Sequence, residues 1–269
     1  MHTPHTPHKE PEEVFIPLSP SRYVEFYSLE MDKHTSDICF YLNNSAEYSK
    51  ILELGCGTGR ISRELSKTCR NVTGLDLSHE MLRLATSHDT NGTDYICMDM
   101  CKMAFTTQFD HIIIPYNTLN LLRTESATLQ CLQQANSLLT PTGSLLFQVY
   151  LPERSLLRQT EKLFQFQMLS LPDNTGKLIK ESIRSFTSDT DIFSLEERYR
   201  VRPSDPDSKK EDLHHIFQLA GFSFEKWISL IKFSHFKVNA LFGDYSNRPF
   251  DKAKDRLLLA IVSKQNSSY

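Results

Sequence analysis

Short apolar runs and amphipathic segments alternate along the first half of the chain. We predict a first strand over Ile51, Leu52 and Leu54, and further strands at residues 71–76, 94–97, 109–114 and 144–150. Between these runs, Ser78 is placed to cap a helix, and residues 124–139 carry apolar side chains at helical spacing. Strands that alternate with helices are typical of a doubly wound, mostly parallel α/β sheet.

The pattern changes after the fifth predicted strand. Residues 155–168 have helical spacing, whereas residues 177–187 and 193–202 have extended character. In the second extended segment Leu195, Tyr199 and Val201 share one face, which is the alternation of a half-buried strand. The two segments predict an antiparallel hairpin joined at residues 189–191. We expect this small β insertion, at about residues 152–206, to form a cap over the sheet.

The last part of the chain predicts one more helix and two strands. Ser208 and Glu211 have capping-box spacing for a helix that ends at Gly221. Residues 222–236 and 256–264 then predict the final strands, which brings the sheet to seven. The second of these segments is apolar at residues 257–262 without interruption, as expected for a central strand.

The beginning of the chain differs from the rest in composition. Residues 1–20 are rich in His, Pro, Thr and Glu without periodicity, so we expect a flexible tail, followed by a domain at residues 21–269. His2, His5 and His8 are regularly spaced, but nothing in such a tail would fix the geometry of a metal site. Residues 22–42 predict a pair of helices before the first strand.

Composition narrows the classes of partner and the compartment. The chain has 269 residues and a formal net charge of −3, which argues against DNA or structured RNA as the main ligand. Its six cysteines form no Cys-x-x-Cys pair, so we expect reduced thiols and no metal. No apolar run approaches the ~20 residues of a membrane span, and no signal-peptide core is present. We therefore expect a cytoplasmic protein.

Three closely spaced glycines follow the first predicted strand, in the stretch ILELGCGTGR at residues 51–60. Gly55, Gly57 and Gly59 allow positive φ and a close approach of backbone to a ligand. Ile61 and Leu65 begin a helix whose free N–H groups point into the turn and favour an anionic group. We expect a ligand with a carboxylate or a phosphate there.

The spacing of the glycines distinguishes two kinds of ligand. A dinucleotide fingerprint needs Gly-x-Gly-x-x-Gly, but Arg60 occupies the place of its third small residue. The pattern Glu-x-Gly-x-Gly-x-Gly that starts at Glu53 instead resembles the first motif of the class I S-adenosylmethionine-dependent methyltransferases. The resemblance covers residues 22–264 and implies S-adenosylmethionine as the cofactor.

Two carboxylates after later strands agree with that resemblance. Asp76 ends the second strand, where an acidic side chain can accept both hydroxyls of a ribose, although it could also be a second helix cap. Asp99 follows the third strand, and the resemblance implies that it accepts from the adenine amino group beside the backbone N–H of Met100. The resemblance also implies cofactor contacts from further residues: Tyr23, Cys56, Leu77 and Pro115.

The reacting centre is less well defined by the sequence. In the resembled family the loop at residues 115–117 lies nearest the methyl group, and the leading tyrosines Tyr23 and Tyr27 often touch the methionine end, although simple packing explains them equally well. The Asp/Asn-Pro-Pro-aromatic signature for amide substrates is absent, which disfavours base or glutamine methylation. Six side chains could act as a base: Tyr116, Asn117, Tyr150, His34, His235 and Tyr245. We select Asn117 and Tyr27 as nearest the methyl group, and expect His214 and His215 on a helix surface or in packing.

Three functions fit these features. The first is methyl transfer to a small polar molecule with an amine or hydroxyl group, and the predicted hairpin would confer its specificity. The second is methylation of tRNA or protein, which predicts a basic strip near the crevice. The third is a cofactor-binding protein without turnover, against which the set of Glu53, Asp76 and Asp99 argues. The sequence does not indicate the oligomeric state. We expect neither a membrane nor DNA as a partner.

Overall fold

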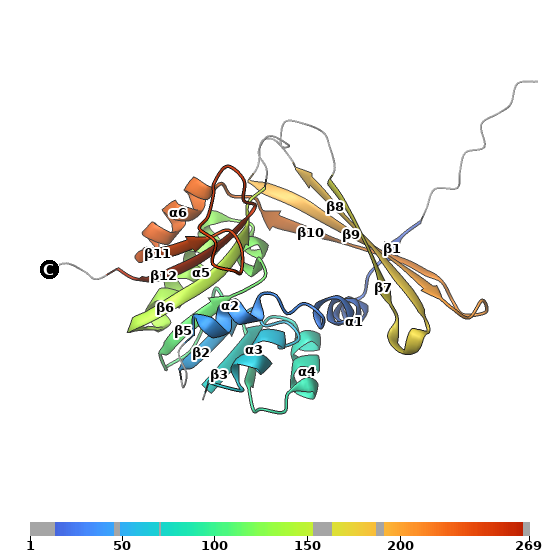
Figure 1. Ribbon diagram of the computed structural model, residues 1–269, viewed down its shortest axis with the longest axis horizontal. Helices are drawn as coiled ribbons and strands as arrows, with labels where there is room; N and C mark the ends of the chain where they lie inside the picture. Colours follow the sequence, from blue (N-terminus) through green and yellow to red (C-terminus); the bar gives the residue numbers. More distant parts are fainter. Residues whose placement is uncertain (1–13, 46–48, 70, 153–162, 187–190, 266–269) are drawn as a thin grey trace, which may run out of the picture.

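Two β-sheets dominate the structure, a computed structural model that describes residues 14–45, 49–69, 71–152, 163–186 and 191–265 (Figure 1). The main sheet has seven strands in the order β11-β12-β6-β5-β2-β3-β4. Their bounds are β2 (Lys50–Leu54), β3 (Asn71–Asp76), β4 (Asp94–Cys97), β5 (Phe109–Ile114), β6 (Leu139–Tyr150), β11 (Phe236–Phe242) and β12 (Leu257–Lys264). Strands β2 to β6 pair in parallel, and β12 is antiparallel to both of its neighbours. The predicted doubly wound, mostly parallel seven-stranded sheet is confirmed.

Strand β2 lies at the point where the direction of strand order reverses. It pairs with β3 on one side and with β5 on the other. Ile51 and Leu52 on β2 are fully buried, because apolar clusters cover both faces of the main sheet. In open α/β sheets, ligands bind outside the carboxyl ends of the strands at such a switch point. The glycine turn that follows β2 is at that place.

Helices cover the main sheet and lead into it. They are α1 (Pro20–Met31), α2 (Ile38–Asn43), α3 (Arg60–Leu65), α4 (His79–His88), α5 (Glu125–Leu138), α6 (Phe224–Phe233) and the 3₁₀ helix η1 (Thr118–Leu122). The predicted pair of leading helices is confirmed by α1 and α2. Ser78 caps α4 as predicted, since its hydroxyl accepts from the N–H of Met81. None of the described helices is long and apolar enough to cross a membrane.

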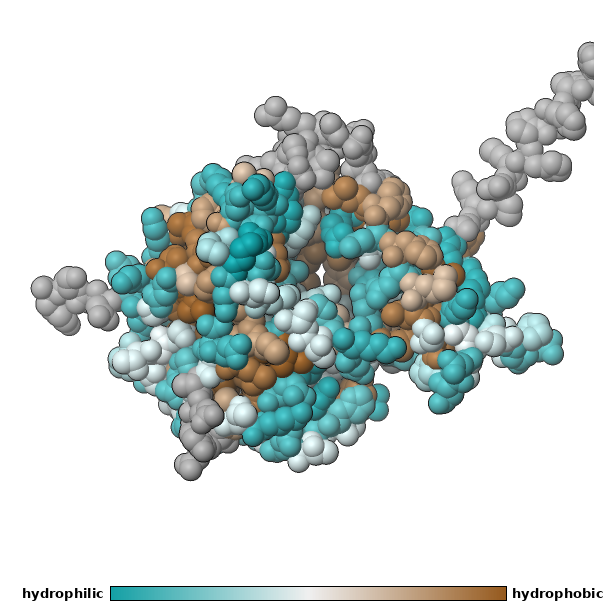
Figure 2. Space-filling view, in the orientation of Figure 1, coloured by the Kyte–Doolittle hydropathy of each residue, from teal (hydrophilic) through white to brown (hydrophobic). Residues whose placement is uncertain are grey.

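The second sheet, here called the cap sheet, has five strands in the order β1-β10-β9-β8-β7. Its members are β1 (Ile16–Pro17), β7 (Leu163–Ser170), β8 (Gly176–Phe186), β9 (Ile192–Pro203) and β10 (Glu211–Ala220). Strands β8 and β9 are the predicted antiparallel hairpin, in a register that places Lys180 opposite Tyr199. Helix α1 packs on this sheet, with Phe26 against Tyr199 and Leu178 in one apolar cluster. Figure 2 shows a hollow between the two sheets.

Three predicted elements are wrong in the described residues. Residues 163–168, expected to be helical, form β7, which pairs with β8 along its length. Residues 211–220 form β10 instead of a helix, because every residue of the strand pairs with β9. Residues 222–236, expected as a strand, contain α6, in which Trp227, Leu230 and Ile231 form the buried helical face.

Strand pairing also alters the expected limits of the cap. Strand β10 belongs to the cap sheet although it lies beyond residue 206, the predicted end of the insertion. Within the predicted tail, Ile16 and Pro17 form β1 and pair in parallel with β10. Residues 1–13, with His2, His5 and His8, lie outside the described residues. We keep the division into a main domain and an inserted cap as a proposal.

Candidate active site

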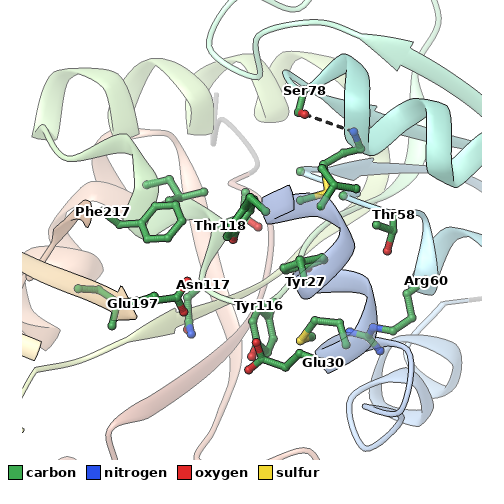
Figure 3. A pocket seen from close by; sticks show the side chains of 18 of the residues that line it. Tyr27, Glu30, Thr58, Arg60, Ser78, Tyr116, Asn117, Thr118, Glu197 and Phe217 are labelled. Carbon is green, nitrogen blue, oxygen red and sulfur yellow. Dashed lines mark hydrogen bonds between the residues drawn. The ribbon is translucent and has the colours of Figure 1, made fainter. Parts of the chain in front are cut away.

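A cavity of about 690 Å³ lies between the carboxyl edge of the main sheet, α1 and the cap sheet (Figure 3). Its wall combines the glycine turn after β2, the end of β3, the loop after β5, and the strands β7 to β10. Nine of the residues predicted for the site line it: Tyr23, Tyr27, Glu53, Gly55, Cys56, Gly57, Asp76, Pro115 and Asn117. Segments that are far apart in the sequence thus meet around one space.

The glycine turn has the backbone shape predicted for it. The φ angles are 73° at Gly55, 53° at Gly57 and 73° at Gly59. A Cβ atom on Gly55 would lie 2.3 Å from Cγ2 of Thr118, so a side chain there would collide with the loop after β5. A Cβ on Gly57 would extend toward the Tyr27 ring, 3.5 Å away, and fill part of the cavity. Gly57 therefore keeps open the space between the turn and α1.

The N–H groups of the turn are mostly used within the protein. Those of Gly55 and Cys56 donate to the carbonyl of Leu75, and that of Gly59 donates to the carbonyl of Cys56. In contrast, the hydroxyl of Thr58, a residue that lines the cavity, is buried and has no hydrogen-bond partner among the residues described. A buried hydroxyl without a partner is costly, and a polar ligand in the cavity would supply one.

Glu53 is buried at the end of β2, with 1% of its surface exposed. Its carboxyl group accepts a hydrogen bond from the hydroxyl of Ser62 on α3. Burial raises its pKa to about 8, although this hydrogen bond and the charge of Arg60 act in the opposite direction. A positively charged ligand group beside Glu53 would favour its ionised form.

Asp76, the last residue of β3, holds two backbone groups. Its Oδ2 accepts from the N–H of Gly57 at 2.8 Å, and its Oδ1 accepts from the N–H of Ser78 at 2.9 Å. Burial raises its pKa, whereas these hydrogen bonds lower it. Asp76 thus joins the glycine turn to the start of α4, and each of its oxygens keeps a lone pair for a ligand. Both roles considered from the sequence are compatible with this position.

The other predicted cofactor residues do not line this cavity. Asp99 accepts from the N–H of Cys101 at 2.8 Å, and Met100 packs partly on the main core. Leu77 is 70% exposed. Gly59 shapes the turn, where a Cβ would collide with Tyr95. The roles of Asp99, Met100 and Leu77 at the adenine end stay predictions.

In the sequence, Arg60 stands out only because it does not fit the dinucleotide pattern. In the structure it has a role of its own. Its guanidinium donates to both oxygens of Asp37 at 2.7 Å and to the carbonyl of His34 at 2.7 Å. Asp37 is fully buried, and Arg60 itself lines the cavity. The pair ties the segment between α1 and α2 to the first turn of α3. No local sequence signal relates two residues so far apart.

The loop after β5 has an uncommon backbone. Tyr116 and Asn117 have φ angles of 50° and 62°, which non-glycine residues rarely adopt. The Oδ1 of Asn117 accepts from Nε2 of Gln148 at 3.1 Å, and Oε1 of Gln148 accepts from the hydroxyl of Tyr245 at 2.5 Å. These hydrogen bonds fix Asn117, which Figure 3 shows at the cavity wall.

The remaining candidate bases are less favourably placed. Tyr116 lines the cavity. Its pKa is raised mainly by burial and, to a smaller extent, by the negative charge of Glu30. His34, Tyr150, His235 and Tyr245 do not line the cavity. His214 and His215 lie in β10 rather than on a helix, and the ring of His215 packs 5.7 Å from that of Tyr23.

The cap sheet contributes charged residues that were not predicted. The ammonium of Lys180 on β8 contacts the carboxylates of Glu30 on α1 and Glu197 on β9. Glu197 also accepts from the hydroxyl of Tyr199 at 2.8 Å. The alternation in residues 193–202 places Glu197 on the same face as Leu195 and Tyr199, so that pattern could have identified it. Among the described residues no cluster of ligands suited to a metal is present.

The comparisons with known proteins relate the part of the chain that contains the glycine turn to methyltransferases. Residues 51–143 match the profile of the family described as "Methyltransferase domain". The Bacillus subtilis (strain 168) protein YqeM, named as a methyltransferase without a stated substrate, is 36% identical over 107 residues. That match covers 39% of this chain and 43% of the relative, so the chain matches less than half the length of this curated relative.

Solved structures share nearly the whole fold at low sequence identity. An S-adenosylmethionine-dependent methyltransferase from Clostridium acetobutylicum superposes with a TM-score of 0.74 at 17% identity, over 90% of this chain and 98% of the other. The sugar N-methyltransferase KedS8 from Streptoalloteichus gives a TM-score of 0.71 at 13% identity, over 98% and 100%. These likenesses show the fold.

Proposed function

Because this chain belongs to the class I S-adenosylmethionine-dependent methyltransferases, we propose that it transfers a methyl group to an amine or hydroxyl of a small polar molecule. The observation that carries the proposal is the shared cavity, in which the glycine turn and the cap sheet form opposite walls. A cofactor at the turn and an acceptor under the cap would meet there. Orientation of two reactants in this manner can contribute about 7–11 kcal/mol to catalysis.

The residues around the glycine turn fit S-adenosylmethionine. Asp76 has lone pairs for ribose hydroxyls, Glu53 offers a carboxyl group to an ammonium, and Thr58 has a buried hydroxyl without a partner. Gly57 leaves the room that a Cβ would fill. When bound, S-adenosylmethionine supplies a methyl group on a positively charged sulfur, which a lone pair of the acceptor displaces in line. We assign Tyr27 and Asn117 to orient the acceptor beside that methyl group.

The charges of the cavity favour a small acceptor over tRNA. The ionisable residues of both signs that line it are Glu30, Glu53, Asp76, Glu197, Arg60, Lys180 and Arg184. Arg60 is paired with Asp37, and Lys180 contacts two carboxylates, so the wall is not a basic surface for phosphates. The sugar N-methyltransferase KedS8, which superposes over 98% of this chain, supports a small-molecule acceptor for this chain.

The first experiment separates binding from turnover. Calorimetry on the purified chain should detect S-adenosylmethionine and S-adenosylhomocysteine with about micromolar Kd, that is about −8 kcal/mol. Incubation with methyl-labelled S-adenosylmethionine and a small-molecule extract should then transfer label to an acceptor. Binding without transfer would support a protein that binds the cofactor without turnover. Absence of binding to either compound would overturn the proposed function.

A further inference from the structure

Two carboxylates share one ammonium group where α1 meets the cap sheet. The Nζ atom of Lys180 lies 2.5 Å from Oε2 of Glu30 and 2.7 Å from Oε1 of Glu197. The second oxygen of Glu197 accepts from Tyr199, whereas Oε1 of Glu30 receives no hydrogen bond from the described residues. Of these two carboxylates, Glu30 thus keeps one oxygen available to a ligand.

This cluster has one negative charge in excess. Its side chains are only 9% (Lys180), 9% (Glu197) and 18% (Glu30) exposed. Burial lowers the pKa of Lys180, but the two carboxylates raise this pKa by more than burial lowers it. The amine therefore stays a cation. An uncompensated charge held away from water is costly, and a bound cation would remove that cost.

The other cations of the cavity wall do not neutralise the cluster. Arg60 is committed to Asp37. Arg184 lies four residues beyond Lys180 on β8, about 13 Å along a strand, and donates to Gln165. In the described part of the chain, Lys180 is the sole basic residue paired with either Glu30 or Glu197. The excess negative charge is thus local to the space under the cap.

Aromatic rings surround the same space. The ring centroid of Tyr23 lies 6.0 Å from that of Tyr27 and 5.6 Å from that of Phe217, and all three side chains line the cavity. Figure 3 shows Tyr116 beside Glu30 and next to Tyr27. The faces of such rings attract cations, most strongly where water is excluded. Carboxylates and aromatic faces together form a site suited to an ammonium ion.

We infer that the methyl acceptor is an amine, bound as an ammonium ion against Glu30 and Glu197 within these aromatic walls. The inference rests on the proposed methyl transfer and selects the amine over the hydroxyl acceptor. A neutral alcohol would leave the excess negative charge uncompensated, whereas an ammonium ion compensates it and donates to the open oxygen of Glu30. Lys180 keeps the two carboxylates close together.

The reaction is balanced without another reactant. The bound ammonium first releases one proton to solvent, because a protonated nitrogen has no lone pair. The lone pair then forms the bond to the methyl carbon while the carbon–sulfur bond breaks and leaves its electron pair on sulfur. The products are a methylated ammonium ion and the neutral thioether. Positive charge returns to the nitrogen in the transition state, where Glu30 and Glu197 stabilise it.

The test follows label from methyl-labelled S-adenosylmethionine into a small-molecule extract incubated with the full chain. Unreacted S-adenosylmethionine is itself a cation, so it is first resolved from the labelled products by chromatography, with a reaction without protein as the blank. The products are then separated on a cation exchanger at neutral pH. We expect the labelled product to be retained as a cation, which supports the inference. Label only in neutral or acidic compounds would overturn the inference and leave the proposed function intact. Absence of transfer to any small molecule would overturn both.

Variants then test the two carboxylates with the retained amine as substrate. Glu30→Gln and Glu197→Gln should each raise its KM about tenfold to a hundredfold, the effect of one lost charge-assisted hydrogen bond. Glu181→Gln is the matched control, because Glu181 precedes Ser182 on β8, faces away from the cavity and pairs with Arg200. Calorimetry with S-adenosylhomocysteine verifies that each variant is folded. An unchanged KM in both folded variants would contradict the inference.

Discussion

Arg60 and Asp37 form a buried ion pair in which two guanidinium nitrogens meet the two oxygens of one carboxylate, each at 2.7 Å. Arg60 is the first residue of α3 and Asp37 is the residue before α2. The pair therefore holds the leading helices against the glycine turn. Two parallel hydrogen bonds between planar groups also fix the orientation of both side chains.

Removal of one partner of this pair should strongly destabilise the protein. Asp37→Asn leaves the guanidinium of Arg60 buried without its counter-charge, which costs about 3–5 kcal/mol of the free energy of unfolding. Urea unfolding of the variant beside the unmodified chain measures this loss. Lys67→Ala, which breaks the exposed pair of Lys67 with Glu64, is the control and should change the free energy by less than about 1 kcal/mol. Equal effects of the two substitutions would contradict the importance of the buried pair.

The stability of the ligand-free protein should depend on the protonation of Glu53. Its pKa rises from 4.5 to about 8 on folding, so its contribution is complete below pH 4.5 and is lost as the pH rises through about 8. Glu53→Gln cannot ionise and should remove this part of the pH dependence. We expect the variant to gain a few kcal/mol relative to the unmodified chain between pH 5 and pH 9. Urea denaturation at pH 5 and at pH 9 measures the free energy of unfolding of both proteins. If this free energy had the same pH dependence in the two proteins, the expectation would be wrong.

Asp76 should be necessary for cofactor affinity. Asp76→Ala removes the carboxylate that we assign to the ribose and the acceptor for the N–H groups of Gly57 and Ser78. We expect the Kd for S-adenosylmethionine to rise about tenfold to a hundredfold, as measured by calorimetry. Asp94→Ala is the matched control, since Asp94 begins β4 at the opposite edge of the sheet. An unchanged Kd in a folded Asp76→Ala protein would exclude the ribose assignment.

Tyr27 and Asn117 should affect turnover more than cofactor binding. Tyr27→Phe keeps the ring and removes the hydroxyl, and Asn117→Gly removes the side chain while glycine accepts a φ of 62°. Each should lower kcat about tenfold to a hundredfold, the range of one lost hydrogen bond at the reacting centre. Steady-state release of S-adenosylhomocysteine measures kcat, with Asn136→Ala on α5 as the control. A normal kcat in either variant would remove that residue from the proposed reacting centre.

The elements of the main sheet could be predicted because each of their signals is local. Strand β2 is apolar at Ile51, Leu52 and Leu54, Ser78 stands immediately before α4, and the glycines after β2 are close in sequence. Residues 211–220 show the limit of such reasoning. Their capping-box spacing favours a helix, but hydrogen bonds with β9 make them a strand. Propensity is a weak preference, and pairing along a whole strand outweighs it.

The same difference between local sequence signals and tertiary packing applies to the two halves of the site. The sequence by itself determined where the cofactor half is expected, because Glu53 and Asp76 stand near the ends of strands β2 and β3, Gly57 follows β2, and the carboxyl ends of parallel strands lie at one edge of a sheet. Tertiary structure alone decided the acceptor half, in which Glu30, Lys180 and Glu197 come from a helix and two strands of the cap. The local pattern sets Glu197 on the apolar face of its strand, but it does not reveal that Glu30 and Lys180 are its neighbours. Only the packing of α1 on the cap sheet removes them from water and places them in contact.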